Sequence, residues 1–246
     1  MTQPIYAIGD IHGQHDMLLD ALTRIEADGG ADARVVILGD LVDRGPDSRA
    51  VIDTLIAGIG QGRDWIVLLG NHDRLFLDYV ETGNPDHPLI RSRTARASGQ
   101  GWLHEIMGGP TTLASYGVDL TLTGDELWAA TRAAVPHFHT DFLKACPLYH
   151  LEPGLLFVHA GIDPRLPLEW QTEEHLLWIR DRFLEHSEPF NWLVVHGHSS
   201  IELPRHYGNR VNLDSGAGFD RPLTTAVLDQ GRVWVLEPHG RIPLDP

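Results

Sequence analysis

Five short apolar segments constrain the fold of this chain most strongly, because each is followed directly by a glycine-containing loop rich in Asp, His, Asn or Arg. Their near-continuous apolar character predicts strands that are covered on both faces, as in a layered α/β domain. Because the carboxyl ends of parallel strands gather at one rim of a sheet, we expect the loops to meet there. The segments are Ile5–Ile8, Val35–Leu38, Trp65–Leu69, Leu155–Val158 and Trp192–Val195.

Apolar residues recur at helical spacing between the first three of these segments, in Asp16–Ala27 and Ser48–Ile59. The first third of the chain therefore reads β-α-β-α-β and predicts an α/β fold. From about residue 76 to 147 the pattern is weaker and mostly helical, which we interpret as a helical insertion within a single domain spanning 1–246. Three later runs predict a β-meander that closes a second sheet: Arg210–Leu213, Leu223–Leu228 and Val233–Leu236.

The composition excludes several classes of protein. With 246 residues, of which 42% are hydrophobic and 22% charged, the chain can bury a large core and is not a disordered chain. Its net charge of −15 disfavours nucleic acid as a partner. We interpret the basic run Arg91, Arg93 and Arg96 as a solvated helix face rather than a patch for acidic substrates.

The chain shows no apolar run of membrane-spanning length and no secretory signal pattern. Cys146 is its single cysteine, so an intramolecular disulfide framework is excluded. We therefore expect a cytoplasmic protein that does not bind a membrane. The sequence leaves its oligomeric state open.

Fifteen histidines are many for a chain of this length, and several of them lie in the five loops. Oxygen and imidazole ligands without thiolate suit Mn, Fe, Zn, Co or Mg. A carboxylate such as Asp40 can bridge two such cations, which together can stabilise both the attacking and the leaving oxygen of a displacement. One such loop alone is usually a turn, but five in the same position after a strand favour a dinuclear metal centre. In chain order the loops supply Asp10 and His12; Asp40, Asp43 and Arg44; Asn71, His72 and Asp73; His159; and His196 and His198.

The first three loops carry a specific pattern: GD-x-HG at Gly9–Gly13, GD-x-VDRG at Gly39–Gly45 and GNH-[DE] at Gly70–Asp73. Together with the later His-Ala-Gly and Gly-His loops, this pattern resembles the phosphoprotein phosphatase branch (serine/threonine phosphatases) of the calcineurin-like metallophosphoesterases. Gly108–Gly117 reads GGPTTLASYG and is similar to bacterial and phage-type members. The resemblance implies a four-layer α/β/β/α sandwich with metals at the strand ends, and it matches the middle insertion less well than the two ends of the chain.

The resemblance also implies two divalent metal ions per chain, with manganese first and Fe, Zn, Co or Mg as alternatives. Asn71 is expected to contact the substrate as well as a metal. His196 ends its strand, so we interpret it as a neighbour of the site rather than a ligand. The implied ligands are Asp10, His12 and the bridging Asp40 for the first metal, and Asp40, Asn71, His159 and His198 for the second.

The implied reaction is direct attack on phosphorus by a hydroxide held between the metals, without a phosphoenzyme. His72 would protonate the leaving oxygen or stabilise charge there, and Asp43 would fix the orientation of His72. Arg44 would bind phosphate oxygens through its planar fork. A second phosphate-binding arginine is expected after a tryptophan in the later half, where Arg180 is predicted and Arg182 is the alternative.

Three functions are compatible with these residues. We expect a phosphomonoesterase, most similar to serine/threonine protein phosphatases, that acts on phosphorylated proteins or small phosphoesters. The alternative is a symmetrical diadenosine tetraphosphate hydrolase, although relatives of that kind often have alanine where this chain has Asp43. A metal-binding scaffold without catalysis is disfavoured, because His72, Asp43 and Arg44 are all present.

Overall fold

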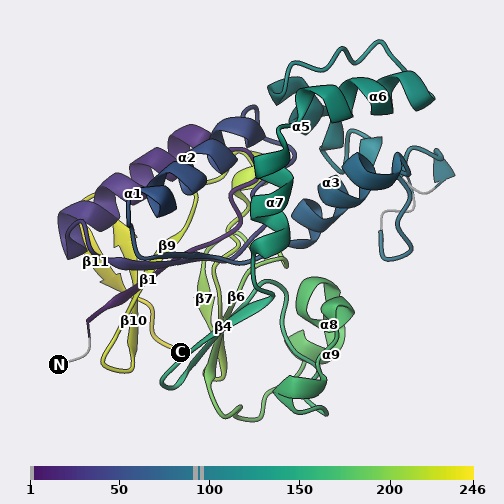
Figure 1. Ribbon diagram of the computed structural model, residues 1–246. Helices are drawn as coiled ribbons and strands as arrows, with labels where there is room; N and C mark the ends of the chain where they lie inside the picture. The colour runs from purple at the N-terminus through teal and green to yellow at the C-terminus, as the bar shows by residue number, and fades with distance from the viewer. Residues whose placement is uncertain (1–2, 91–93, 95–96) are drawn as a thin grey trace.

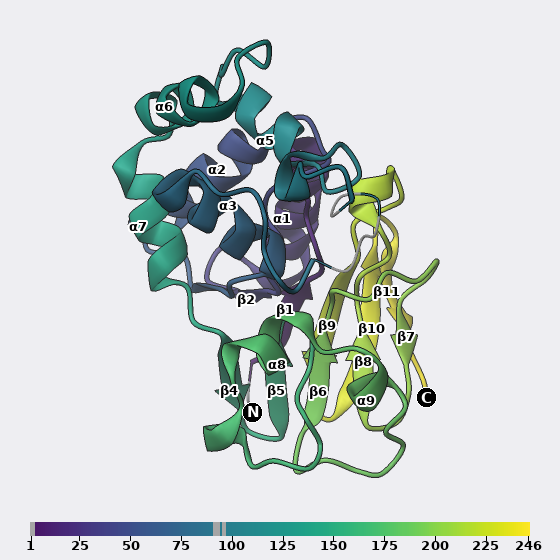
Figure 2. The same cartoon turned by 90° about the vertical axis from the view of Figure 1, so that its right-hand side faces the viewer.

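Two facing β-sheets form the centre of the molecule, and helices cover the outer face of each sheet (Figures 1 and 2). The computed structural model describes residues 3–90, 94 and 97–246, so the basic run at Arg91, Arg93 and Arg96 lies outside the described residues. The first sheet contains β1 (Ile5–Ile8), β2 (Arg34–Ile37), β3 (Trp65–Val67), β9 (Thr225–Asp229), β10 (Arg232–Glu237) and β11 (Gly240–Pro243). The second contains β4 (Tyr149–Glu152), β5 (Leu155–Val158), β6 (Leu193–His196), β7 (Arg205–His206) and β8 (Arg210–Asn212).

The strand order is β11-β10-β9-β1-β2-β3 in the first sheet and β4-β5-β6-β8-β7 in the second. Three neighbouring strands of each sheet run parallel: β1, β2 and β3 in the first, and β5, β6 and β8 in the second. Antiparallel strands extend the first sheet on the β1 side and the second sheet on both sides. The loops after the parallel strands therefore leave from one end of the sandwich, as the sequence pattern predicts.

Helices from separate parts of the chain form the outer layers. The first sheet is covered by α1 (His15–Gly29) and α2 (Ser48–Gly60), and the second by α8 (Glu173–Trp178) and α9 (Asp181–Leu184) (Figures 1 and 2). These layers confirm the expected α/β/β/α sandwich. The middle of the chain is mostly helical, as predicted: it contains α3 (Asn71–Thr82), η1 (Gly101–Leu103), α5 (Gly109–Ser115), α6 (Gly124–Ala134) and α7 (His137–Ala145). Two further short turns are η2 (Leu168–Trp170) and η3 (Ala217–Phe219).

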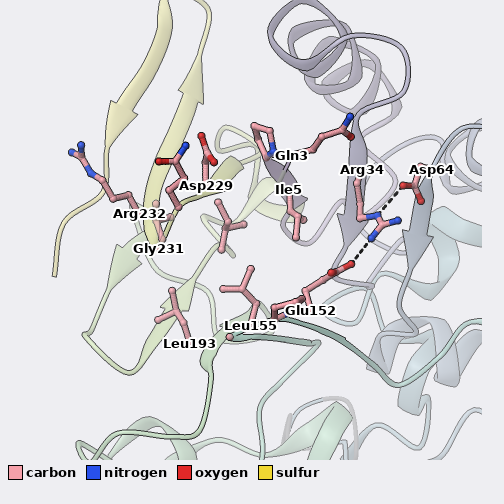
Figure 3. Close-up of a pocket in the computed structure, with 16 residues that line it drawn as sticks. Gln3, Ile5, Arg34, Asp64, Glu152, Leu155, Leu193, Asp229, Gly231 and Arg232 are labelled. Atoms are coloured by element: carbon pink, nitrogen blue, oxygen red, sulfur yellow. Dashed lines mark hydrogen bonds and ion pairs between the residues drawn. The ribbon is translucent and has the colours of Figure 1, made fainter. Parts of the chain in front are cut away.

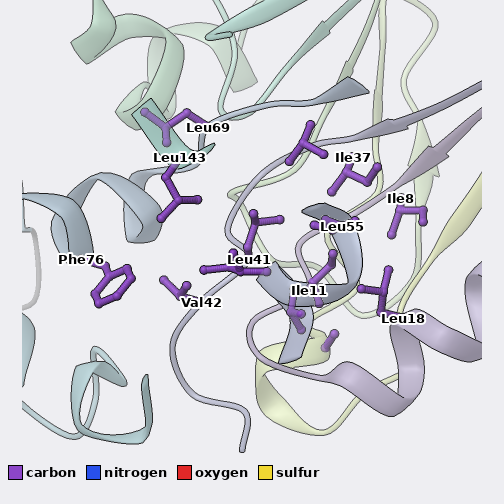
Figure 4. Close-up of a cluster of buried hydrophobic side chains, with 14 of the residues drawn as sticks. Ile8, Ile11, Leu18, Ile37, Leu41, Val42, Leu55, Leu69, Phe76 and Leu143 are labelled. Carbon is purple, nitrogen blue, oxygen red and sulfur yellow. The ribbon is translucent and has the colours of Figure 1, made fainter. Parts of the chain in front are cut away.

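Alternation along the strands sorts side chains between the layers. In β1, Tyr6 and Ile8 pack toward α1 and α2, whereas Ala7 between them packs against the second sheet. In β5, Phe157 faces the first sheet and its neighbours face α8 and α9. Because successive side chains of a strand point to opposite faces, an apolar run is what a strand buried on both faces requires. Figure 4 shows part of the cluster beneath the first helical layer, where Ile8 and Ile37 lie near Leu18 and Leu55.

The end of the chain departs from the predicted topology. The run at 210–213 pairs with the second sheet as expected, since Val195 lies opposite Val211 in parallel register. The two later runs instead join the first sheet, where Ala7 of β1 lies opposite Ala226 of β9 in antiparallel register. The prediction of one meander closing the second sheet was therefore wrong for these strands. Local alternation predicts a strand but does not select its partner.

The helical middle packs onto the rest of the core through aromatic side chains. Trp102 is fully buried, and its ring centroid lies 5.1 Å from that of Tyr79 and 5.9 Å from that of Phe76. These residues share one buried cluster with α1 and α2. Within the described part of the chain, every helix is too short or too polar to cross a bilayer.

Candidate metal centre

Loops from both sheets meet at the carboxyl ends of the parallel strands. The backbone N–H of His12 donates to the carbonyl of Asp40 over 2.8 Å, which joins the first two loops. The backbone N–H of Gly197 donates to the carbonyl of His159 over 2.8 Å, which joins the last two. Nδ1 of His159 lies 2.9 Å from the carbonyl oxygen of Leu38, so the two sheets also contact each other here. The structure thus brings the five polar loops together.

The first group of possible ligands contains His12, Asp40 and His72, whose donor atoms lie within 4.8 Å of one another. Nδ1 of His12 is 2.9 Å from the carbonyl of Val42 and must donate to it, because a carbonyl only accepts. Nε2 of His12 therefore carries a lone pair, and it lies 3.5 Å from Oδ2 of Asp40. Burial, followed by the charge of Arg44, holds the pKa of His12 well below its usual value, which keeps the ring neutral and able to bind a cation.

The second group contains Asp40, His159 and His198, again within 4.8 Å of one another. Asn71 lies between them: its Oδ1 is 2.7 Å from Nδ1 of His198 and 2.9 Å from Nε2 of His159. Nε2 of His159 is also 3.4 Å from Oδ1 of Asp40. Nδ1 of His159 donates its proton to Leu38, so the Nε2 lone pair faces two oxygens. These nitrogen and oxygen atoms are close enough together to coordinate one cation.

Asp10 approaches the centre from the side of His198, whose backbone N–H donates to Oδ2 of Asp10 over 3.0 Å. Its Oδ1 is buried and has no hydrogen-bond partner among the residues that the structure describes. Burial, then the charges of Asp214 and Asp40, raises the pKa of Asp10 well above its usual value. A divalent cation among these carboxylates would relieve their repulsion, so the residues present fit the two-metal site that the sequence predicts.

Asp40 is common to both groups, with Oδ2 on the His12 side and Oδ1 on the His159 side. Its Oδ1 also accepts a hydrogen bond from the backbone N–H of His72 over 2.9 Å. This placement suits a carboxylate that bridges two cations. Asp10 belongs to neither compact group, whereas His72, which the sequence assigns to proton transfer, lies within the first.

The backbone at the centre is strained in a way that few other positions share. Of the seven non-glycine residues with positive φ in the described chain, five belong to the polar loops. Residues with side chains rarely adopt this conformation, and where they do the strain is often part of a functional site. These five are His12 (φ 49°), Asp40 (49°), Asp43 (76°), Arg44 (68°) and His198 (63°).

Asp43 and His72 form a buried pair beside the first group. Nδ1 of His72 lies 2.6 Å from Oδ2 of Asp43, which also accepts a hydrogen bond from Nε1 of Trp102 over 2.7 Å. Oγ1 of Thr112 donates to Oδ1 of Asp43 over 2.7 Å. Burial raises the pKa of Asp43 to about 7, and the bonds from Thr112 and Trp102 oppose this rise. Burial, followed by the charge of Arg44, lowers the pKa of His72 to about 3.

Arg44 spans the two imidazoles of the first group. Its Nη1 lies 2.6 Å from Nε2 of His12, and its Nη2 lies 3.0 Å from Nε2 of His72. The planar guanidinium therefore directs two donors at the first group of ligands. A cation bound to Nε2 of His12 would use the same lone pair as this hydrogen bond, so it would displace Nη1 of Arg44.

Of the two later arginines, Arg180 lies at the centre. Its Nη2 donates to the carbonyl of His198 over 3.1 Å and its Nη1 to Oγ of Ser199 over 3.3 Å. Arg182 instead points to Asp163, with Nη1 and Oδ2 2.6 Å apart. Of the two candidates, Arg180 is therefore the one that contacts the polar loops.

His196 is buried and belongs to neither group of ligands. Its ring packs edge-on against Phe183, with centroids 4.9 Å apart. Its Nδ1 lies 3.0 Å from the carbonyl of Gly197. This contact agrees with its interpretation as a neighbour of the site.

Three residues support the centre through hydrogen bonds that the sequence does not predict. Trp102 and Thr112 hold Asp43 from the helical middle of the chain, 59 and 69 residues away in sequence. Thr112 lies within the GGPTTLASYG segment, so the resemblance of that segment could have identified it. No sequence pattern marks Trp102. Asp73 accepts backbone N–H groups of Leu41 (2.8 Å) and Gly70 (2.9 Å), and so ties two of the loops together.

Cavities lie both beside and far from this centre. One of about 380 Å³ is lined by Trp178, Ile179, Arg180 and Leu89, and so opens next to the second group. A larger cavity of about 520 Å³ lies at the opposite end of the sandwich, where β1 and β5 begin (Figure 3). There Arg34 pairs with Asp64 and Glu152, over 2.8 and 2.7 Å. Its position separates this larger cavity from the polar loops.

Comparison with known proteins agrees with this architecture. Residues 3–222 match the family described as calcineurin-like phosphoesterase. A symmetrical bis(5'-nucleosyl)-tetraphosphatase of Methylobacillus flagellatus is 30% identical over 246 residues, covering 98% of this chain and 69% of that protein. The solved structure of a cold-active protein tyrosine phosphatase superposes with a TM-score of 0.63 at 18% identity, covering 100% of this chain and 79% of that one.

Other relatives are longer than this chain. A symmetrical bis(5'-nucleosyl)-tetraphosphatase of Bordetella parapertussis is 32% identical over 163 residues, which are 66% of this chain and 45% of that protein. The match thus spans about half the length of that relative. The family match extends from the first strand to the loop after β8, and so includes every polar loop described above. The chain therefore belongs to the calcineurin-like phosphoesterase family, as its three N-terminal motifs indicate.

Proposed function

We propose that this phosphoesterase hydrolyses dinucleoside tetraphosphates symmetrically, at the central phosphoanhydride. The observation that carries the proposal is the relative from Methylobacillus flagellatus, which bears this activity in its name and aligns with 98% of the chain. This was the alternative expected from the sequence, and the relatives favour it over a serine/threonine protein phosphatase. Asp43 favours the phosphatase, but it is a single residue of the site.

The arrangement of positive side chains supports a polyphosphate substrate. Arg44 contacts the first group of ligands through His12, and Arg180 contacts the second through His198. A linear tetraphosphate carries charge on both sides of its central bond, so arginines on both sides of the cleavage point can bind it. They supply local positive charge in a protein whose net charge is −15.

Two divalent cations, with manganese as the first candidate, would neutralise charge at phosphorus and lower the pKa of a water molecule. Five residues would hold them beside Asp10, with Asp40 shared. They are His12, Asp40, Asn71, His159 and His198. Asn71 would also orient the substrate oxygens through its side-chain amide.

His72 would serve the leaving oxygen of the substrate. Asp43 accepts the Nδ1 proton of His72, so Nε2 is the atom that faces the substrate. Arg44 donates to that nitrogen, so proton donation requires Arg44 to move onto the phosphate and Nε2 to gain a proton. The charge of Asp40 favours the protonated ring, and binding of an anionic substrate would favour it further.

The products of one substrate test the proposal. Purified protein loaded with Mn²⁺ is incubated with diadenosine tetraphosphate, and the nucleotides are separated by anion-exchange chromatography. Symmetrical cleavage gives ADP alone. ATP with AMP would show asymmetrical cleavage, and no cleavage by protein that hydrolyses p-nitrophenyl phosphate would refute the proposed substrate.

A phosphomonoesterase acting on phosphoserine or phosphothreonine is the second candidate. The Asp43–His72 pair favours it, because the resemblance associates this aspartate with protein phosphatases. Turnover of a phosphopeptide panel by the same preparation measures this activity. A value of kcat/KM higher for phosphopeptides than for diadenosine tetraphosphate would make this second function the principal one.

A further inference from the structure

An aromatic side chain stands exposed beside the candidate metal centre. Phe219 is 55% exposed and ends η3, in the loop that follows β8. We propose that Phe219 is a stacking platform for one nucleobase of the substrate, an inference that rests on the proposed dinucleotide function.

The loop lies directly against the centre. A side chain added at Gly218 would come within 2.8 Å of Cδ2 of His12 and 2.9 Å of Cδ of Arg44. Glycine therefore allows the loop backbone to reach the first group of ligands. The next residue, Phe219, has its ring centroid 4.7 Å from Cζ of Arg44. The aromatic ring is thus one side chain away from the arginine that is proposed to bind phosphate.

The backbone of the loop is held in place although the ring is exposed. The N–H of Phe219 donates to the carbonyl of Gly216 over 2.8 Å, and Nε2 of Gln14 donates to the carbonyl of Ala217 over 3.1 Å. Nη2 of Arg221 donates to Oγ of Ser200 over 2.7 Å. A fixed backbone presents the ring in a defined place and reduces the entropy lost when a ligand stacks on it.

The chemistry around the ring fits a nucleotide. Cζ of Arg221 lies 6.0 Å from the centroid of Phe219, so two guanidinium groups border one aromatic ring. A nucleotide carries its aromatic base one ribose beyond its phosphates, as Phe219 lies one side chain beyond Arg44. Stacking between bases and aromatic side chains is favourable and tolerates any base. A phosphoserine residue itself carries no ring.

Two ligands that differ only by a nucleoside isolate the contribution of the ring. Calorimetry on Mn²⁺-loaded protein measures the dissociation constants of α,β-methylene-ADP and of methylenediphosphonate. The quantity compared between variants is the ratio of the two dissociation constants. A substitution that weakens phosphate binding by displacing Arg44 affects both ligands equally and leaves this ratio unchanged. We expect Phe219→Ala to reduce the nucleotide's advantage at least about fivefold. Phe219→Trp keeps the advantage, because it retains an aromatic face.

Phe138 provides a matched control, because it is also 55% exposed but lies on α7. Phe138→Ala should leave both dissociation constants unchanged. A ratio in Phe219→Ala within twofold of the wild-type ratio would overturn the inference, and so would an equal loss of both ligands. If wild-type protein splits diadenosine tetraphosphate while the ratio stays constant, the stacking role alone fails. If the wild type does not split it, the proposed function fails.

Discussion

Nδ1 of His72 lies 2.6 Å from Oδ2 of Asp43, and the two side chains are 5% and 0% exposed. The carboxylate cannot rotate freely, because Trp102 and Thr112 hold its two oxygens. The imidazole is therefore fixed with Nε2 toward Arg44. We therefore propose that Asp43 acts through His72 as a positioning residue, which is the most specific mechanistic expectation for this site.

Replacing the imidazole tests whether His72 transfers a proton or binds a metal. We expect His72→Asn to reduce kcat about 100- to 10,000-fold on diadenosine tetraphosphate, the range typical of a lost acid-base group. Metal content should remain two per chain. The hydrogen bond that orients Asp40 comes from the backbone N–H of residue 72, so the substitution keeps it. Elemental analysis of the purified variant measures the metal content, and loss of one equivalent would reassign His72 as a ligand of the first group.

Removing the guanidinium of Arg44 should affect the substrate and leave the metals in place. For Arg44→Ala we expect kcat/KM to fall about 10- to 100-fold, through a higher KM and a lower kcat, because charge-assisted bonds to phosphate are lost. Metal affinity should stay equal or rise, because Nε2 of His12 loses a competing donor. Arg63→Ala is the control, since Arg63 pairs with Glu26 on the surface. Wild-type kinetics in Arg44→Ala would remove Arg44 from the site.

Gly197 should be intolerant of any side chain. A Cβ atom there would collide with Oδ1 of Asp10, which is one of the proposed ligand atoms. We expect Gly197→Ala to fold, as judged by circular dichroism, but to lose at least one metal equivalent. Gly60→Ala is the matched control, because Gly60 ends α2 with open space around it. Full metal content in Gly197→Ala would show that Asp10 is not needed as a ligand.

A buried histidine outside the polar loops, His139, is expected to make stability depend on pH. Nε2 of His139 lies 2.9 Å from Oδ1 of Asp53 and its Nδ1 2.8 Å from the hydroxyl of Tyr116. Burial lowers the pKa of His139, and Asp53 opposes this. A lowered pKa means that the unfolded chain takes up this proton first as the pH falls below about 6.5. The stability is therefore complete above that pH and is lost as the pH falls through the folded-state pKa.

We expect His139→Gln to have a shallower dependence of unfolding free energy on pH between 7 and 5. The slope should decrease by at most about 1.4 kcal/mol per pH unit, which is the limit for one proton. Urea titrations of wild type and variant at several pH values measure it. Equal slopes would show that His139 does not contribute.

Much of the centre was predictable, because its residues lie at fixed places in the local sequence. Each motif glycine and ligand follows an apolar segment that is typical of a buried strand, so the meeting of Asp10 and Asp40 follows from how parallel strands of one sheet are ordered. Helices α1 and α2 were predictable for the same reason: their apolar spacing has a local period. These features need no knowledge of distant contacts.

The rest depended on contacts between distant segments. β9 and β10 carry ordinary strand patterns, and only packing decides that β9 pairs with β1. Trp102 lies in a region of weak periodicity, and its bond to Asp43 joins residues 59 positions apart. Phe219 looks like any exposed aromatic residue until its position against Arg44 is known. Local sequence patterns contain none of this information.

Anomalous diffraction from crystals grown with Mn²⁺ tests the central claim most directly, since it locates each ion without reference to activity. We predict two peaks that share Asp40, one flanked by His12 and the other by His159 and His198. A single peak, or manganese bound outside these loops, would contradict the assignment of a dinuclear centre to this chain.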